Sequence, residues 1–244
     1  MQCIAPFWYG TFLMLKIENL NQYYGQSHTL WDLDIEVPEG KCTVLMGRNG
    51  VGKTTLLQCI MGLLPVKSGS MDYAGTDLVR AGAEQRAGLG IGYVPQGRQI
   101  FPLLSVEENL LIGLPARRDG LRRIPDFIYE LFPVLSEMLG RRGGDLSGGQ
   151  QQQLAIGRAL VTDPRLLILD EPTEGIQPNI VADIGEIVRR LNREMGLTVL
   201  LVEQKLPFAR RVADRFCLLD RGRNVAGGMM EELNDELIQQ YLTV

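Results

Sequence analysis

A glycine-rich segment near residue 50 has the composition of a phosphate-binding loop. It reads GRNGVGKT over residues 47–54 and matches the spacing G-x-x-x-x-G-K-[ST]. Glycines let consecutive backbone N–H groups point at phosphate oxygens, and a following helix presents the positive end of its dipole to the same anion. In such a loop Lys53 reaches the β- and γ-phosphates of a nucleotide, and the Thr54 hydroxyl can hold Mg²⁺. The alternative, a tight glycine turn beside a solvated lysine, does not explain the strand and helix patterns on either side.

Two adjacent acids end a second apolar segment. In RLLILDEPTEG, residues 165–175, four apolar residues precede Asp170 and Glu171. This pattern indicates a buried parallel strand, and ligands of open α/β sheets bind beyond the carboxyl ends of the strands. Adjacent strand residues point to opposite faces, so we expect Asp170 to hold Mg²⁺ and Glu171 to orient or deprotonate the attacking water. Standing alone, the pair would also suit a helix cap.

A third segment reads LSGGQQQQ over residues 146–153 and runs into a helical pattern. Ser147 is a good N-cap, which places Gly148 and Gly149 in the first helical turn. The N–H groups at that end of the helix favour an anion. An ordinary capped helix is the alternative interpretation of this segment alone.

The scaffold that positions these segments alternates strands with helices. Strands are predicted at 41–46, 166–170 and 198–203, and helices at 53–64 and about 177–195. This alternation predicts an α/β fold with a mainly parallel sheet that is covered on both faces.

The remaining segments predict additions to this core. Residues 15–46 form a strand-rich region, and residues 66–94 have the pattern of short strands and turns. Residues 103–142 carry helical patterns interrupted by prolines, which suggests a helical insertion. After about residue 222, one closing strand and one helix are expected.

Composition narrows the class of protein. The 244 residues are 45% hydrophobic and 22% charged, which is ordinary globular composition. The net charge of −4 comes with no basic stripe, so we expect no nucleic acid partner. The scattered cysteines form no CxxC metal pair and suggest reduced core thiols of a cytosolic protein. They are Cys3, Cys42, Cys59 and Cys217.

Residues 1–15 are uncharged and largely apolar, but Pro6 and Gly10 interrupt them. A membrane-spanning helix needs ~20 apolar residues, and a signal peptide would carry early positive charge. We therefore expect Met14 to be the natural start, residues 1–13 to be an upstream extension outside the fold, and the chain not to cross a membrane by itself.

Together, the phosphate loop, the acidic pair and the LSGGQ signature resemble the ATP-binding cassette (ABC) family over about residues 14–244. The resemblance implies a single ATP-binding domain with a P-loop NTPase core, an N-terminal antiparallel β subdomain and an inserted helical signature subdomain at about 97–160. It also implies that two cassettes enclose two ATP molecules head to tail. Each γ-phosphate then lies between the phosphate loop of one subunit and the signature of the other.

The same resemblance assigns roles to single residues. Tyr24 is similar to the aromatic that stacks on adenine, and Gln96 in YVPQG to the glutamine that senses Mg²⁺ and the attacking water. The residues expected to bind ATP are Tyr24, Gly47, Arg48, Asn49, Gly50, Val51, Gly52, Lys53, Thr54, Thr55, Ser147, Gly148, Gly149 and Gln150. Those expected at Mg²⁺ are Thr54, Gln96 and Asp170, and those expected to be catalytic are Glu171, Gln204 and Gln96.

Two positions depart from the family pattern. The interface loop EGIQ, residues 174–177, ends in Gln177 where the family commonly has Asp. The switch position, directly after the strand expected at 198–203, holds Gln204 where the family commonly has His. The only histidine, His28, lies far away in the sequence. Glutamine can donate a hydrogen bond to a phosphate oxygen but cannot carry a proton's charge. The activity of this subunit's own site is therefore an open question at this point.

Finer motifs point to a transport group. YVPQGRQIFP and DEPTEGIQP resemble the importers of branched-chain amino acids and urea, and together they are more similar to the urea group. The resemblance implies the ATP-hydrolysing subunit of a bacterial importer that energises urea uptake across the inner membrane; branched-chain amino acid import is the alternative. The implied partners are a second ATP-binding subunit (different in the transporter, identical in isolation), two membrane permeases and an extracytoplasmic binding protein. The chain would then sit on the cytoplasmic face of the membrane.

Other function classes stay open at this stage. A soluble ABC ATPase of repair or translation would usually carry a second cassette or long coiled insertions. A small-molecule kinase would need no LSGGQ, and a regulatory module would bind ATP without hydrolysing it.

Overall fold

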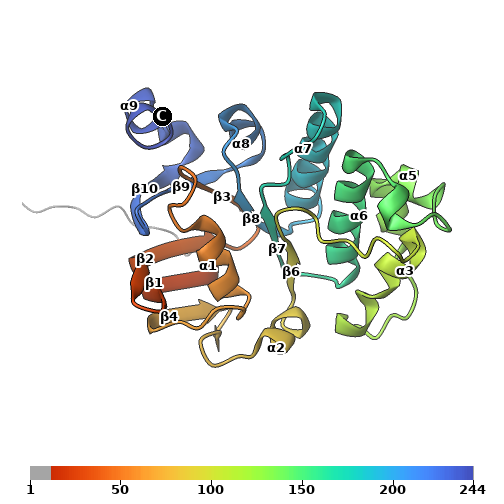
Figure 1. Cartoon of the computed structure of the whole chain (residues 1–244), viewed down its shortest axis with the longest axis horizontal. Coiled ribbons are helices and arrows are strands. Elements are labelled where there is room, and N and C mark those ends of the chain that lie inside the picture. The colour runs from red at the N-terminus through yellow and green to blue at the C-terminus, as the bar shows by residue number, and fades with distance from the viewer. Residues whose placement is uncertain (1–11, 244) are drawn as a thin grey trace, which may run out of the picture.

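Figure 1 shows the computed structural model, which describes residues 12–243. In this range a six-stranded sheet has the order β10-β9-β3-β8-β7-β6. Its strands are β3 (Cys42–Met46), β6 (Ile91–Val94), β7 (Leu166–Asp170), β8 (Thr198–Val202), β9 (Arg215–Asp220) and β10 (Arg223–Met229). All neighbours are parallel except β9 and β10. The predicted α/β class with a mainly parallel sheet is confirmed.

The central strands β3, β7 and β8 are buried along their whole length because helices or a second sheet cover both faces. Alternate residues of each strand enter two different cores. In β7, for example, Leu167 and Leu169 pack with the helices on one face, whereas Leu166 and Ile168 pack with α1 and the small sheet on the other. The helices around this sheet are α1 (Lys53–Ile60), α6 (Gly148–Val161), α7 (Pro178–Arg193), α8 (Leu206–Val212) and α9 (Asp235–Tyr241).

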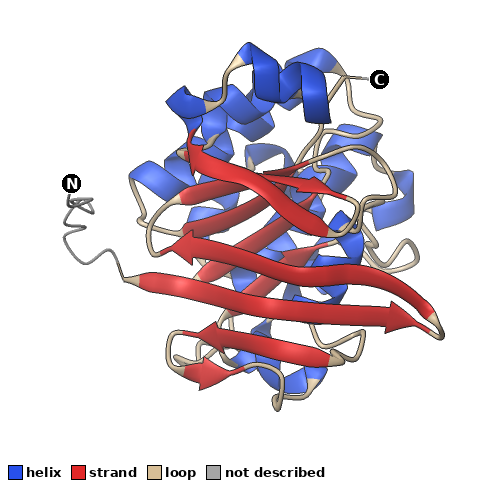
Figure 2. Cartoon of the chain, turned by 90° about the vertical axis from the view of Figure 1, so that its left-hand side faces the viewer, coloured by secondary structure: helices blue, strands red, loops and turns tan. Residues whose placement is uncertain are grey.

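A second, antiparallel sheet of four strands in the order β2-β1-β4-β5 lies against α1. Its strands are β1 (Leu13–Tyr24), β2 (Ser27–Pro38), β4 (Ser68–Tyr73) and β5 (Thr76–Asp77). The long β1–β2 hairpin dominates the view in Figure 2. This is the antiparallel sheet that the resemblance implied. A short helix, α2 (Ala83–Gly88), lies where short strands and turns were expected.

A helical region follows β6, as predicted for residues 103–142. It consists of α3 (Val106–Leu111), η1 (Leu114–Ala116), α4 (Asp126–Leu131), α5 (Pro133–Ser136) and η2 (Gly143–Asp145), and it leads into α6. Its helices pack on α6 through residues such as Leu110, Ile128 and Leu135. After β10, η3 (Met230–Glu232) and α9 end the described chain.

The start of the fold differs slightly from the expected boundary. Leu13 belongs to β1 and pairs with Pro38, and the carbonyl of Phe12 accepts a 2.8 Å hydrogen bond from Glu39 N. Residues 1–11 of the expected upstream extension lie outside the described residues, so that expectation stays a prediction. In the described part of the chain, no helix has the length and apolar character needed to cross a membrane.

Candidate nucleotide-binding site

The phosphate loop joins β3 to α1 and depends on glycine at two positions. Gly47 has φ +150°, and an added Cβ would lie 2.3 Å from the carbonyl oxygen of Leu219. Gly52 has φ +108°, and a Cβ there would lie 2.8 Å from Leu30. A side chain at Gly47 would clash with the backbone of β9 and one at Gly52 with the Leu30 side chain, and glycine adopts both φ angles most readily. The loop thereby brings the start of α1 to the carboxyl edge of the sheet.

Lys53 is the first residue of α1, and its side chain is turned into the loop. Its ammonium donates to the carbonyls of Gly47 (2.8 Å) and Arg48 (2.9 Å) and lies 4.0 Å from Glu171 Oε1. Burial lowers the pKa of Lys53, and the charges of Glu171 and Asp170 oppose that shift. The ammonium is therefore held within reach of the place where a phosphate would meet the loop.

Asp170 ends β7 and is 2% exposed. Among residues 12–243, neither of its buried carboxylate oxygens has a hydrogen-bond partner, although the Thr54 hydroxyl is close enough to favour the charged form. Burial, reinforced by the adjacent Glu171 charge, raises the pKa of Asp170 to about 6. A buried carboxylate without a partner next to a hydroxyl is a donor set that suits a hard cation such as Mg²⁺. The residues present thus fit the metal that the sequence predicts.

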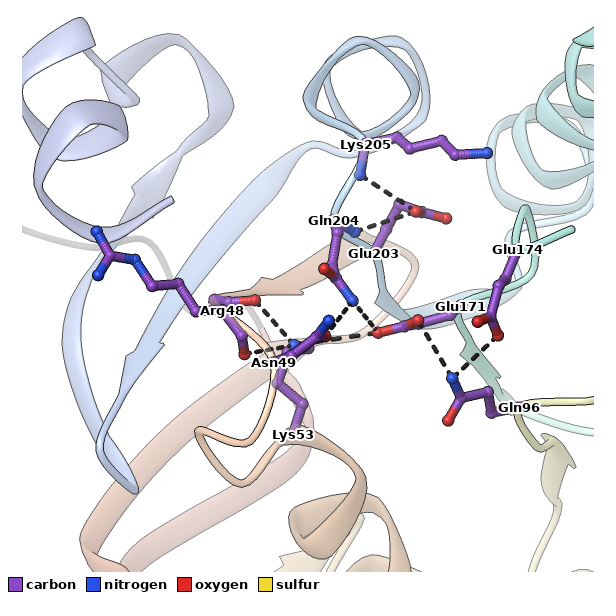
Figure 3. Close-up of polar contacts among 10 residues, drawn as sticks. Arg48, Asn49, Lys53, Gln96, Glu171, Glu174, Glu203, Gln204 and Lys205 are labelled. Carbon is purple, nitrogen blue, oxygen red and sulfur yellow. Dashed lines mark hydrogen bonds and ion pairs between the residues drawn. The ribbon is translucent and has the colours of Figure 1, made fainter. Parts of the chain in front are cut away.

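Glu171 leaves the strand with a left-handed backbone (φ +48°), and its N–H donates to the carbonyl of Val202. Its carboxylate joins the other predicted catalytic residues (Figure 3). Glu171 Oε1 accepts a 2.5 Å hydrogen bond from Gln204 Nε2, and Oε2 accepts a 3.4 Å hydrogen bond from Gln96 Nε2. The amide of Gln204 also donates to Asn49 Oδ1 at 2.7 Å, which links it to the phosphate loop.

Two acids of this site were not predicted. Glu174 Oε2 accepts a 2.9 Å hydrogen bond from Gln96 Nε2. Glu203 is 3% exposed, and burial raises its pKa. Its Oε1 accepts from the backbone N–H groups of Gln204 (3.0 Å) and Lys205 (3.2 Å), and its Oε2 accepts from the Thr173 hydroxyl at 2.9 Å. Glu203 therefore fixes the backbone that carries Gln204. The only sequence signal is its place at the end of an apolar strand, which it shares with Asp170.

Tyr24 and Arg48 lie at the two sides of the loop. Tyr24 is 48% exposed, and its hydroxyl lies 3.5 Å from Thr55 Oγ1 and 3.4 Å from Gln58 Oε1. Its ring thus stands beside α1, where a base could stack on it. The Arg48 guanidinium instead points to the C-terminal segment and donates to the carbonyls of Thr243 and Gln240. The guanidinium is therefore occupied within the chain, and the expectation that Arg48 binds ATP stays a prediction that concerns its backbone N–H.

The signature lies at the start of α6. Ser147 Oγ accepts from Gln150 N (3.3 Å), and Ser147 N donates to Gln150 Oε1 (2.9 Å), which forms a capping box. A Cβ on Gly149 would lie 2.8 Å from Ile180 of α7. Gln152 is buried, and Gln151 donates to the carbonyl of Gly143, so these two side chains make contacts within the chain.

The signature and the phosphate loop open two different helices. Helix α6 packs in the core on one face of the large sheet and α1 in the core on the other. Within residues 12–243, no hydrogen bond joins residues 147–150 to residues 47–55. One chain therefore presents two separate helix ends that favour anions.

Comparisons with known proteins agree with this geometry. The family described as "ABC transporter" matches residues 30–174, more than half of the chain. The high-affinity branched-chain amino acid transport ATP-binding protein BraG of Pseudomonas aeruginosa is 44% identical over 213 residues, which cover 87% of this chain and 91% of BraG. The probable branched-chain amino acid transport ATP-binding protein LivF of Archaeoglobus fulgidus is 37% identical over 221 residues, 90% of this chain and 94% of LivF.

Solved structures show the same fold with nucleotide bound. The dimeric post-hydrolysis structure of the ATP-binding cassette MJ0796 with ADP and Pi superposes with a TM-score of 0.80 at 25% identity, covering 89% of this chain and 99% of that one. The ADP form of the cassette MJ1267 superposes with a TM-score of 0.78 at 29% identity, covering 94% and 98%. The chain therefore belongs to the ABC transporter family and is an ATP-binding-cassette ATPase.

Proposed function

We propose that this chain hydrolyses ATP as the nucleotide-binding subunit of an importer. The observation that carries the proposal is the position of Glu171, whose carboxylate lies 4.0 Å from Lys53 Nζ and accepts hydrogen bonds from Gln204 and Gln96. In the proposed mechanism the phosphate loop and Lys53 bind the β- and γ-phosphates. Glu171 accepts the proton of the attacking water, and Gln204 donates a hydrogen bond to the γ-phosphate.

Mg²⁺ would be held by Asp170, Thr54 and Gln96, and when bound it neutralises negative charge on the phosphates. Gln204 replaces the usual histidine in this scheme. Its amide already bridges Glu171 and Asn49, and Glu203 holds its backbone in place. The proposed role needs a donated hydrogen bond but no titratable group, so a glutamine suffices.

A second cassette completes the proposed site, because the signature of one chain would bind the nucleotide held by the phosphate loop of the other. The dimeric arrangement described for the MJ0796 relative supports this proposal. In a transporter the second cassette would be a different chain, and in isolation a second copy of this one.

We propose that the membrane partner docks in a groove of about 450 Å³ between the sheet and the helical region. Its lining includes Leu63, Phe101 and Ile112, which are 59%, 44% and 45% exposed. Exposed apolar side chains gathered in one groove are typical of a protein interface. Gln96 lies at the edge of this region, next to Pro95 of the lining. Docking one of the two permeases here would place the chain on the cytoplasmic face of the membrane.

The transported solute is proposed from the relatives. BraG and LivF are named for branched-chain amino acid transport, so we propose that this chain energises branched-chain amino acid import, fed by an extracytoplasmic binding protein. The motif-based expectation of urea has no support from these relatives and stays a prediction.

One experiment tests both the transport role and the identity of the transported solute. Cells lacking this chain are compared with complemented cells for uptake of labelled leucine and labelled urea. Loss of leucine uptake alone supports the proposal, and loss of urea uptake alone supports the earlier expectation. Unchanged uptake of both solutes would contradict a transport role, and an ATPase assay of the purified chain with its partner cassette tests hydrolysis separately.

A further inference from the structure

Three consecutive residues directly after Gln96 have a left-handed backbone. Their φ angles are +75° at Gly97, +69° at Arg98 and +45° at Gln99. Glycine adopts such angles freely, but a strained non-glycine residue costs on the order of 1–3 kcal/mol. Strain of this kind persists only when the surroundings hold it in place. This segment must therefore be fixed by contacts from outside it.

Helix α6 supplies the first of these contacts. Arg158, near the end of α6, donates to the carbonyls of Gln99 (2.8 Å) and Arg98 (3.5 Å). Its guanidinium also lies over the ring of Phe101, 5.1 Å from the centroid. The helix that begins with the signature thus holds the backbone of the strained segment.

The side chain of Arg98 makes the second set of contacts. Its Nη1 donates to Gln151 Oε1 (3.3 Å) in the first turn of α6, and its Nη2 donates to the carbonyl of Glu174 (3.5 Å). A Cβ added to Gly148 would lie 3.3 Å from this guanidinium. The amide of Gln96 meanwhile donates to Glu174 Oε2. Arg98 and Gln96 therefore both bind Glu174. Arg98 binds its backbone carbonyl, and Gln96 binds its carboxylate.

The positive charge of Arg98 does not stabilise α6, because a cation at a helix N-terminus opposes the helix dipole. In the described part of the chain, Arg98 also forms no ion pair with a carboxylate. Its position is better explained by the three parts that it connects, which are the segment after Gln96, the loop after Glu171 and the start of the signature helix.

We propose that Arg98 is a positioning residue. It holds Gln96 beside Glu171, and the position of Gln96 then depends on the position of the signature helix α6. The inference rests on the proposed function, since Gln96 must act in hydrolysis. A movement of α6 would shift Gln96 in two ways, through the Arg98 guanidinium and through the backbone of residues 98 and 99, which Arg158 binds. The catalytic site would in this way respond to the signature of its own chain, which binds the nucleotide of the partner.

The variant Arg98→Gly tests this role, because glycine tolerates φ +69° and only the side chain is lost. We expect a melting temperature equal to or above wild type and nucleotide affinity within about twofold of it. In the assembled transporter, kcat for ATP should fall about 10- to 100-fold with little change in KM, as for a displaced catalytic group. Arg98→Lys should recover part of the loss. Ala74→Gly, which changes a left-handed residue (φ +48°) in the turn before β5, is the matched control and should keep wild-type kcat.

A double variant shows whether Arg98 acts through Gln96. In a Gln96→Ala background, Arg98→Gly should cause no further loss of kcat. Wild-type kcat in Arg98→Gly, or the same fall in both backgrounds, would overturn the inference while leaving the proposed function intact. A wild-type assembly that hydrolyses no ATP would instead overturn the proposed function, and the inference with it.

Discussion

The side-chain amide of Gln204 donates to Glu171 Oε1 at 2.5 Å and to Asn49 Oδ1 at 2.7 Å. A single donor group thus joins the proposed general base to the phosphate loop. Glu203 fixes the backbone of Gln204 from the buried side. The position that commonly holds histidine in this family is therefore occupied by a residue with defined partners.

Replacing Gln204 by alanine should slow hydrolysis much more than it weakens nucleotide binding. Removal of one donor to a developing negative charge costs on the order of 100-fold in kcat. Gln204→His should retain a large part of the rate because imidazole also donates a hydrogen bond. Steady-state ATPase kinetics of both variants check this prediction. Equal rates for Gln204→Ala and wild type would show that the amide has no role in catalysis.

The variant Glu171→Gln should bind ATP but hydrolyse it at least about 100-fold more slowly, since loss of a general base typically costs this much. We expect it to accumulate as a closed dimer when ATP and Mg²⁺ are present, and size-exclusion chromatography measures this directly. The control is the same variant with ADP, which should elute like wild type. Hydrolysis at the wild-type rate would contradict the general-base assignment.

Lys53→Ala should weaken ATP binding by about 10- to 100-fold. Hydrogen bonds to charged groups contribute about 1.5–3 kcal/mol, and each 1.4 kcal/mol corresponds to about tenfold in affinity. Titration with a fluorescent ATP analogue gives the dissociation constant. Lys205→Ala is a useful control, because its ammonium donates to the carbonyl of Thr173. If Lys53→Ala bound as tightly as wild type, the phosphate-loop role of Lys53 would be lost.

Gly149→Ala should destabilise the fold. The new methyl group would lie 2.8 Å from Ile180 Cγ2, and overpacking of this kind costs about 1–3 kcal/mol. Gly140→Ala is the matched control, because no atom of the described residues other than its chain neighbours lies within 4 Å of its Cβ position. Urea denaturation measures the free energy of unfolding of both variants. It is also measured for the double variant Gly149→Ala, Ile180→Ala, which lacks the obstructing side-chain atoms and should regain stability. A Gly149→Ala protein as stable as the control would show that α6 and α7 separate easily.

The buried thiols should react slowly in the native protein. Burial raises the pKa of Cys59 to about 11 and of Cys217 to about 12, and it raises the pKa of Cys42 well above its usual range. The thiolate is the reactive form, so a higher pKa means less reaction at pH 8 and a gain only at strongly alkaline pH. In a Cys3→Ser variant, a thiol reagent at pH 8 should label no cysteine in buffer and all three in denaturant. Rapid labelling of a native thiol would contradict this.

Much of the core was predictable because its signals are local. The strand ending at Asp170 is a continuous apolar run, and its predicted range of 166–170 agrees with β7. The phosphate loop and the capped start of α6 follow from short motifs whose geometry is set within a few residues. These features need no knowledge of the rest of the chain.

The remaining features depend on partners that are distant in sequence. The direction of the Arg48 side chain is set by the carbonyl of Thr243, 195 positions further along the chain. Glu203 joins the site through Thr173, 30 positions away. The short helix α2 contains glycine and has only six residues, too few for a clear periodic pattern. Strand β9 was missed because a short apolar run does not by itself distinguish strand from buried helix.

The contact between Arg48 and the end of α9 has a practical consequence. The carbonyls of Gln240 and Thr243 are bound to a residue inside the phosphate loop, so a purification tag or fluorescent protein attached close behind Thr243 would disturb this contact. A fusion at this end is therefore a poor choice for measuring nucleotide affinity. A cellular protein that binds residues 240–243 would release Arg48 and so change the phosphate loop without entering the nucleotide site.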